Sequence, residues 1–267
     1  LVALVGLLAA TLAVHLARQT SRSDRDWAAD QAVAARITLT DERAEIANAR
    51  DFRHREDGSW EERYLDLSAS LDDVRSVWLL IAPFAERWRG LAHTFLSFEV
   101  AGDRFVAVSV EARRERHEDY SLTGGLLRRF ELTYVVGTED DLVGLRALRG
   151  DTLYLYPSTA TPEQARALFV DVLQRAERMR VDPEFYNTLT NNCATNLRDH
   201  INRLAPGTLP WGWGVLLPGF ADALALDHGL LDTDLPLDEA RERFRVDEVA
   251  REAVLAGRSV SAAMRGR

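Results

Sequence analysis

The hydrophobic period changes once along this chain, and that change constrains the fold more than any other feature of the sequence. Between residues 37 and 156, apolar and polar residues alternate in short runs, which is typical of half-buried β-strands. From residue 161 onward, the apolar residues recur at helical spacing. Strands followed by helices predict an α+β domain, and a clear hairpin predicts that its sheet is antiparallel.

The hairpin fixes which side chains face each other. If its turn has three residues, Val100 pairs with Arg104 and His93 faces Glu111 across the two strands. A two-residue turn would place Glu111 on the opposite face of the sheet from His93. The predicted strands are residues 37–39, 44–52, 62–67, 74–81, 93–100, 104–112, 130–136 and 153–156.

The first strong helix signal is a capping box. Thr161 is followed by proline at the first helical position and by Gln164 three residues later, so we expect a helix from there to about residue 180. Charged helical segments follow from residue 238 onward. The residues that the first helix should bury are Ala165, Leu168, Phe169, Val172, Leu173 and Ala176.

A second helix should begin at Asn191 or Asn192 and end near Leu204. If Asn192 caps it, Cys193 lies in the first turn, where unsatisfied backbone N–H groups and the helix dipole lower the pKa of a thiol. A lone cysteine is also one of the most commonly buried small residues, so its position alone favours a packing role.

The first 17 residues carry no charge, and we interpret them as a membrane anchor. Because the sequence starts with Leu rather than Met, we expect the apolar segment to be truncated at its N-terminus. The alternatives are the apolar region of a signal peptide or a buried helix. Residues 18–35 are polar and rich in alanine and are expected to form a tether, and residues 36–267 form the domain.

Composition excludes several classes of protein. The net charge of −9 repels phosphate backbones, so nucleic acid is not an expected partner. All 33 basic residues are arginine, which excludes Schiff-base and P-loop lysine chemistry. One cysteine and six scattered histidines give little support for a metal site, and no cofactor is expected.

Three residues together supply the parts of a thiol acyl-transfer site. Cys193 is the candidate nucleophile, His93 the candidate base and Glu111 the group that would orient the imidazole. A histidine at the start of an apolar strand is also commonly a satisfied core residue. The Cys193 backbone N–H and a neighbouring donor would hold the oxyanion. The candidate donors are Asn191, Asn192 and Asn196.

A loop rich in glycine, proline and tryptophan follows the second helix. Its apolar side chains are typical either of a membrane-facing surface or of residues that cover a core. We take them as candidates for substrate binding: Trp211, Trp213, Leu216, Leu217 and Phe220.

Several runs resemble the Lnb N-terminal periplasmic domain family. The similar segments lie between about residues 24 and 235, and the combination of the last run with the second is specific. The runs are DFRHRED, AHTFLSFEV, AVSVEARRE, FELTYVVGTEDD and PEFYNTLTNNCATNLRDHIN.

The resemblance implies a permuted papain-like domain of the NlpC/P60 type, in which the histidine strand precedes the cysteine helix. It implies a bacterial membrane protein whose domain lies outside the cytoplasm, with Cys193 as nucleophile and His93 as base. The implied activity is transfer of acyl groups of lipids or lipoproteins. The alternatives are a cell-wall amidase or peptidase, which would need a polar groove beside Cys193, and a non-catalytic envelope binding module.

Overall fold

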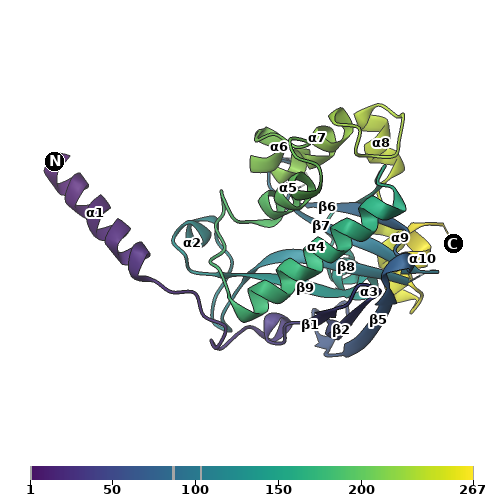
Figure 1. The fold of residues 1–267 in the computed structure, drawn as a ribbon, viewed down its shortest axis with the longest axis horizontal. Coiled ribbons are helices and arrows are strands. Elements are labelled where there is room, and N and C mark those ends of the chain that lie inside the picture. Colours follow the sequence, from purple (N-terminus) through teal and green to yellow (C-terminus); the bar gives the residue numbers. More distant parts are fainter. Residues whose placement is uncertain (1, 86–87, 103, 267) are drawn as a thin grey trace.

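A computed structural model describes residues 2–85, 88–102 and 104–266 (Figure 1). The strands lie before residue 158 and helices follow from residue 162, as the change of period predicts, but helices also form at residues 122–126 and 139–148, between strands. The strands are β1 Arg36–Leu39, β2 Arg43–Arg50, β3 Arg53–His54, β4 Trp60–Glu61, β5 Tyr64–Ser70, β6 Ser76–Pro83, β7 Ala92–Ala101, β8 Arg104–Arg113, β9 Glu131–Thr138 and β10 Tyr154–Pro157. The α-helices are α1 Val2–Arg18, α2 Leu122–Leu126, α3 Glu139–Leu148, α4 Pro162–Val181, α5 Cys193–Leu204, α6 Trp213–Leu216, α7 Ala221–Asp227, α8 Leu237–Arg243, α9 Asp247–Leu255 and α10 Val260–Met264.

An eight-stranded sheet forms the centre of the domain. Its strands lie in the order β1-β2-β9-β8-β7-β6-β10, and β5 pairs with β2 outside this path. Every pairing in this sheet is antiparallel except the one between β2 and β9, where Arg50 is the partner of Gly137. The structure therefore confirms an α+β domain with a mostly antiparallel sheet.

The two faces of the sheet are buried under different helices. On β7, Leu96 and Phe98 belong to the core that includes α4 and the start of α5, and α4 crosses this face in Figure 1. Phe95 belongs to a second core, formed with residues of α3 and α9. Because successive side chains of a strand point to opposite faces, Phe95 faces the α3 side of the sheet and Leu96 faces the α4 side.

The β7–β8 hairpin corrects the expected turn but keeps the expected register. Ala101 pairs with Arg104, as in a two-residue turn, rather than Val100 with Arg104. A β-bulge between Glu99 and Ala101 adds one residue to β7, so that Glu99 pairs with Phe105 and the rest of the hairpin has the register of the three-residue turn. The bulge thus cancels the change of face that a two-residue turn alone would cause.

The predicted helices form at their predicted boundaries. The capping box at Thr161 is present, and all six residues expected to be buried on α4 are buried. Helix α5 begins directly after Asn192, and the charged C-terminal segments form α8, α9 and α10.

The N-terminal segment forms α1, which projects from the body of the domain in Figure 1. The expected transmembrane helix is not found: no helix in the described ranges combines the length and the apolar character needed to cross a bilayer. The segment predicted as a tether lies against the domain. Arg25 pairs with Glu115 and Glu131, and Trp27 is buried beside Arg113.

Candidate functional site

Helix α5 begins at Cys193 because Asn192 caps it. The Asn192 side chain accepts a hydrogen bond from the Thr195 backbone N–H at 3.0 Å, and the Asn192 backbone N–H donates to the Thr195 hydroxyl at 2.8 Å. This reciprocal capping box fixes the first turn of the helix. Cys193 is therefore held at the helix N-terminus, where the sequence predicts it, with 7% of the residue exposed.

The other two candidate asparagines shape the turn before the helix. Asn191 donates to the Glu184 carboxylate at 3.2 Å and to the Phe185 C=O at 2.9 Å. Asn196 donates to the Asn191 side chain and to the Asn192 C=O, both at 2.9 Å. Both amide hydrogens of each side chain already have acceptors, so Asn191 and Asn196 are placed to support the turn.

The sulfur of Cys193 lies in a protected environment beside β7. Burial raises the pKa of the Cys193 thiol, although backbone N–H groups of Thr94 and Ala194 and the Thr94 side chain act in the opposite direction. The sequence predicts a lowered pKa from the helix N-terminus, and the structure corrects this because loss of hydration outweighs the nearby N–H dipoles. The resting thiol is therefore protonated at neutral pH, and its chemistry requires a base.

His93 and Glu111 lie close together, as the hairpin register predicts, but a third residue joins them. The His93 Nε2 atom lies 2.6 Å from the Ser109 hydroxyl, which donates to Glu111 Oε1 at 2.8 Å. The direct distance from His93 Nε2 to Glu111 Oε1 is 3.9 Å. Glu111 thus reaches the imidazole through Ser109 rather than directly.

Arg146 of α3 completes this cluster. Its guanidinium donates to Glu111 Oε1 at 3.1 Å, and Gln31 donates to Oε2 at 3.2 Å. Burial alone would raise the pKa of Glu111, but Arg146 and His93 lower it to about 2. Burial and the charge of Arg146 lower the pKa of His93 to about 3, so the imidazole is neutral at pH 7.

Replacing His93 by glutamine should make folding less sensitive to acid. Below pH 6.5, the usual pKa of histidine, the unfolded chain binds a proton at His93 that the folded, buried imidazole does not bind until about pH 3. The free energy of unfolding therefore decreases as the pH is lowered across this range. His93→Gln should reduce the slope by up to about 1.4 kcal/mol per pH unit. Urea unfolding between about pH 5 and 7 measures this change.

The matched control for that measurement is His117→Gln, since His117 is largely exposed. It should keep the wild-type slope. A His93→Gln protein whose stability varies with pH as steeply as that of the wild type would contradict the buried, neutral state of His93.

Cys193 meets β7 at Thr94, the residue next to His93. The Thr94 backbone N–H and side chain are the β7 groups that interact with the sulfur. The His93 ring points toward Ser109 and stacks on Phe95, whose centroid is 5.5 Å away. Among the described residues, no hydrogen bond joins the Cys193 sulfur to the imidazole. The His93 side chain lies with Phe95, Ser109 and Glu111 on the face of the sheet that α3 covers, whereas Thr94 meets Cys193 on the opposite face, so the structure does not bring the imidazole and the sulfur together.

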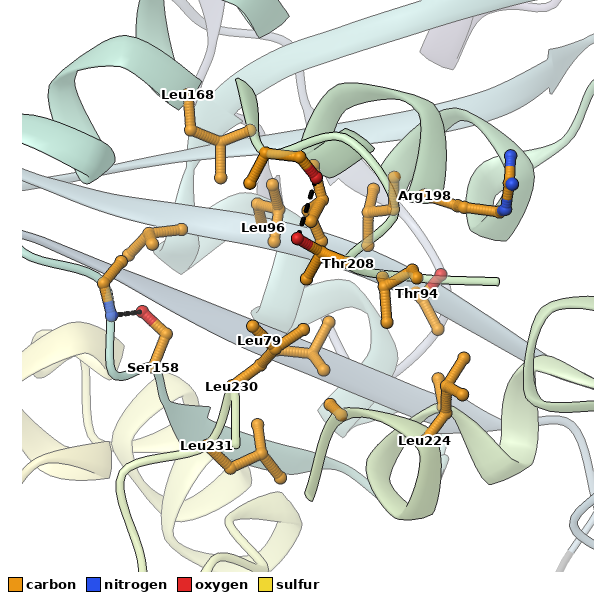
Figure 2. A pocket seen from close by; sticks show the side chains of 18 of the residues that line it. Leu79, Thr94, Leu96, Ser158, Leu168, Arg198, Thr208, Leu224, Leu230 and Leu231 are labelled. Atoms are coloured by element: carbon orange, nitrogen blue, oxygen red, sulfur yellow. Dashed lines mark hydrogen bonds between the residues drawn. The ribbon is translucent and has the colours of Figure 1, made fainter. Parts of the chain in front are cut away.

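An apolar cavity of about 280 Å³ opens beside the start of α5 (Figure 2). Thr94 and Ala194, the neighbours of the sulfur, both line it. Arg198 lies at one end, with its guanidinium over the Trp211 ring. The aliphatic side chains that line the cavity are Val77, Leu79, Leu96, Leu168, Leu197, Ile201, Leu204, Leu209, Val215, Leu224, Leu230 and Leu231.

The five candidate substrate-binding residues lie around α6 rather than in the cavity wall. Trp213 is 75% exposed, and Trp211, Leu216 and Phe220 are also exposed. Leu217 is half-buried. The residues of this loop that line the cavity are Thr208, Leu209, Gly214 and Val215, so the exposed aromatic side chains lie beside residues of the cavity wall.

Sequence reasoning missed Ser109, Arg146 and Thr94. Ser109 lies two residues before Glu111, so strand alternation alone places both on one face and could have identified it. Arg146 reaches the cluster from α3, which no local pattern connects with the hairpin. Thr94 gains its role only from the packing of α5 on β7.

The described ranges contain no cluster of three or more His, Cys, Asp or Glu side chains that could hold a metal ion.

A family model, described as the Lnb N-terminal periplasmic domain, matches residues 60–219, which is more than half of the chain. No curated protein and no solved structure matches the chain.

Proposed function

Since the chain belongs to the Lnb N-terminal periplasmic domain family, we propose that it is a membrane-anchored, thiol-dependent acyltransferase. Its substrates are acyl groups of lipids or lipoproteins outside the cytoplasm. The His93 strand precedes the Cys193 helix along the chain, in accord with the permuted papain-like arrangement that we assign to the domain.

The apolar cavity beside Cys193 carries this proposal. Twelve aliphatic side chains line it, and Ala194 connects its wall to the helix start at Cys193. A peptide of the cell wall would need hydrogen-bonding groups in such a space, because burying unpaired amides is costly. An acyl chain needs none, and its burial is favourable. The lining therefore favours acyl transfer over an amidase or peptidase of the NlpC/P60 type.

The proposed reaction begins with attack of the Cys193 sulfur on an acyl carbonyl carbon as the thiol gives up its proton to a base. Backbone N–H groups at Thr94 and Ala194 hold the oxyanion. Collapse of the tetrahedral intermediate breaks the ester C–O bond, and the alcohol leaves with the proton that the thiol gave up. An acceptor amine then attacks the thioester, and the sulfur leaves and regains a proton.

The chain also carries surfaces suited to a membrane. Helix α1 presents exposed apolar side chains, including Val5 and Leu7, and we assign it to the membrane attachment. The exposed tryptophans around α6 are of the type found at bilayer interfaces. The segment from Leu204 to Phe220 contains no charged residue, in a protein with 28% charged residues overall. Together these features would bring the cavity to the lipid surface.

The decisive test of the function is the choice of acyl donor. Wild-type protein should form a thioester with a diacylated lipopeptide or a phospholipid and should not cleave peptidoglycan stem peptides. Ile201→Trp, which fills the cavity from α5, should lower the rate about tenfold or more with long acyl chains and little with acetyl donors, because one or a few methylenes in an apolar pocket change binding by about 1–3 kcal/mol.

Leu255→Trp on the exposed side of α9 is the matched control and should behave as the wild type. In the same assay, Trp213→Ala should slow reaction with donors in vesicles but not with donors in detergent. Cleavage of stem peptides without use of lipid donors would contradict this proposal and show that the protein is an amidase or peptidase. The absence of any covalent adduct or cleavage would favour a non-catalytic binding module.

A further inference from the structure

Arg198 is the one charged side chain among the described residues that line the apolar cavity. Figure 2 shows this side chain extending from α5 to the edge of the lining, away from the leucines. The Arg198 side chain is 17% exposed, so most of it is shielded from water. A cation at the edge of an apolar cavity favours a ligand that combines an apolar chain with an anionic group.

The guanidinium of Arg198 uses one of its three nitrogens in hydrogen bonds to the described residues. Nη1 donates to Asp199 Oδ1 at 2.9 Å, whereas Nε is buried without a partner and Nη2 donates to none of these residues. Nε–H and Nη2–H lie along one edge of the guanidinium, which is a geometry that binds two oxygens of a phosphate or carboxylate. Because a buried N–H without an acceptor is unfavourable, a ligand oxygen at this edge would be stabilising.

The position of Arg198 on α5 connects this edge with the start of the helix. Ala194 and Arg198 both line the cavity and are four residues apart, so they lie on one face of the helix, about 6 Å apart along its axis. In a phospholipid, the glycerol unit separates the phosphate from the acyl esters by a few bonds. A phosphate bound at Arg198 would therefore leave the acyl chain free to enter the cavity.

We propose that Arg198 binds the phosphate of a phospholipid whose acyl chain occupies the cavity. The Nε and Nη2 edge recognises the anion, and the aliphatic wall recognises the chain. That this lipid is the acyl donor rests on the proposed function, but the binding itself does not. Asp199, whose side chain is 52% exposed, carries the opposing charge and weakens the binding of the anion.

The binding site is tested by calorimetric titration of the full-length protein with three lipids below their critical micelle concentrations. The probes are a lysophosphatidylglycerol, the monoacylglycerol with the same acyl chain, and the corresponding free fatty acid. The lysophospholipid should bind about tenfold or more tightly than the monoacylglycerol, because it adds charge-assisted hydrogen bonds. Equal affinities would overturn the proposal, and tighter binding of the fatty acid would show that the site prefers a carboxylate.

Two variants change the charge at the site in opposite directions. Arg198→Gln should bring the ratio of the two affinities close to one, and unchanged binding of the monoacylglycerol would show that the cavity is intact. Asp199→Asn removes the competing carboxylate and should increase the ratio. A preference for the lysophospholipid that survives in Arg198→Gln would overturn the assignment.

The matched control is Arg251→Gln, which removes an exposed arginine of α9 and should keep the wild-type ratio. Ile201→Trp should weaken both lipids, and unchanged affinities in that variant would show that the lipids bind outside the cavity. A preference for phosphate in a protein that forms no thioester would overturn the proposed function and leave the binding site intact. Thioester formation without this preference would overturn the binding site alone.

Discussion

Cys193→Ala should abolish the covalent acyl adduct and lower turnover by more than about 10⁴-fold, as loss of a catalytic nucleophile does in other acyl-transfer enzymes. Cys193 is the sole cysteine of the chain, so no other thiol can carry the acyl group, and its neighbour Ala194 lines the cavity proposed to bind the acyl chain. The measurement is intact-protein mass spectrometry after incubation with the lipid donor, before and after treatment with hydroxylamine, which cleaves thioesters.

The control for this result is Cys193→Ser. It keeps a small polar side chain at the same buried site, so that any loss of adduct reports on the sulfur and not on packing. The serine variant should form at most a hydroxylamine-resistant ester, slowly. An adduct of wild-type amount in Cys193→Ala would show that the acyl group is attached elsewhere.

The acidity of the thiol explains why the site needs a base. Burial raises the pKa of Cys193 despite its place at the start of α5, so the thiolate is not present in the resting protein. The helix N-terminus and the Thr94 N–H can still stabilise negative charge on sulfur once the proton has moved. Under the proposed function, the nucleophile is formed only when a base takes the thiol proton as the sulfur attacks.

Local signals were sufficient for much of this fold. The capping boxes at Thr161 and Asn192 fixed the starts of α4 and α5 because each depends on side chains within three residues of the cap. The alternation in the strands likewise reflects only which face is buried. These features are encoded by neighbouring residues, so the sequence alone defines them.

The bulge in the hairpin shows where local reasoning fails. Turn length alone would have moved Glu111 to the other face, and only the extra residue between Glu99 and Ala101 restores the register. Whether a strand accommodates such a residue depends on the packing of both faces of the sheet. The cavity could not be predicted from local sequence for the same reason, since its lining residues range from Val77 to Leu231 and come together only in the folded domain.

The DFRHRED run contacts the start of α3 in a way that no local pattern predicts. One buried carboxylate, Asp141 at the start of α3, accepts bonds from Arg50 at 2.8 and 3.0 Å and from the Phe52 N–H at 2.9 Å. His54 Nε2 lies 2.8 Å from the same carboxylate. Two separate segments of the resemblance, residues 51–57 and the FELTYVVGTEDD run, thus meet at one side chain.

Asp141→Asn should therefore destabilise the domain by about 3–5 kcal/mol, the cost of leaving a buried charge without its partner. Both Arg50 and Asp141 are almost completely buried, so water cannot replace the lost carboxylate. For a chain of this size such a loss corresponds to a fall in Tm of roughly 10 °C. Thermal unfolding followed by circular dichroism measures it.

The matched control is Asp24→Asn, which breaks the ion pair with Arg22 on an exposed surface and should leave Tm essentially unchanged. Burial alone would raise the pKa of Asp141, but bonds from His54 and Arg50 hold it below its usual value. Its stabilisation is therefore present above about pH 4 and lost as the pH falls. Asp141→Asn should accordingly differ most from the wild type at neutral pH and least in acid. An equal deficit at all pH values would show that the carboxylate acts by shape rather than by charge.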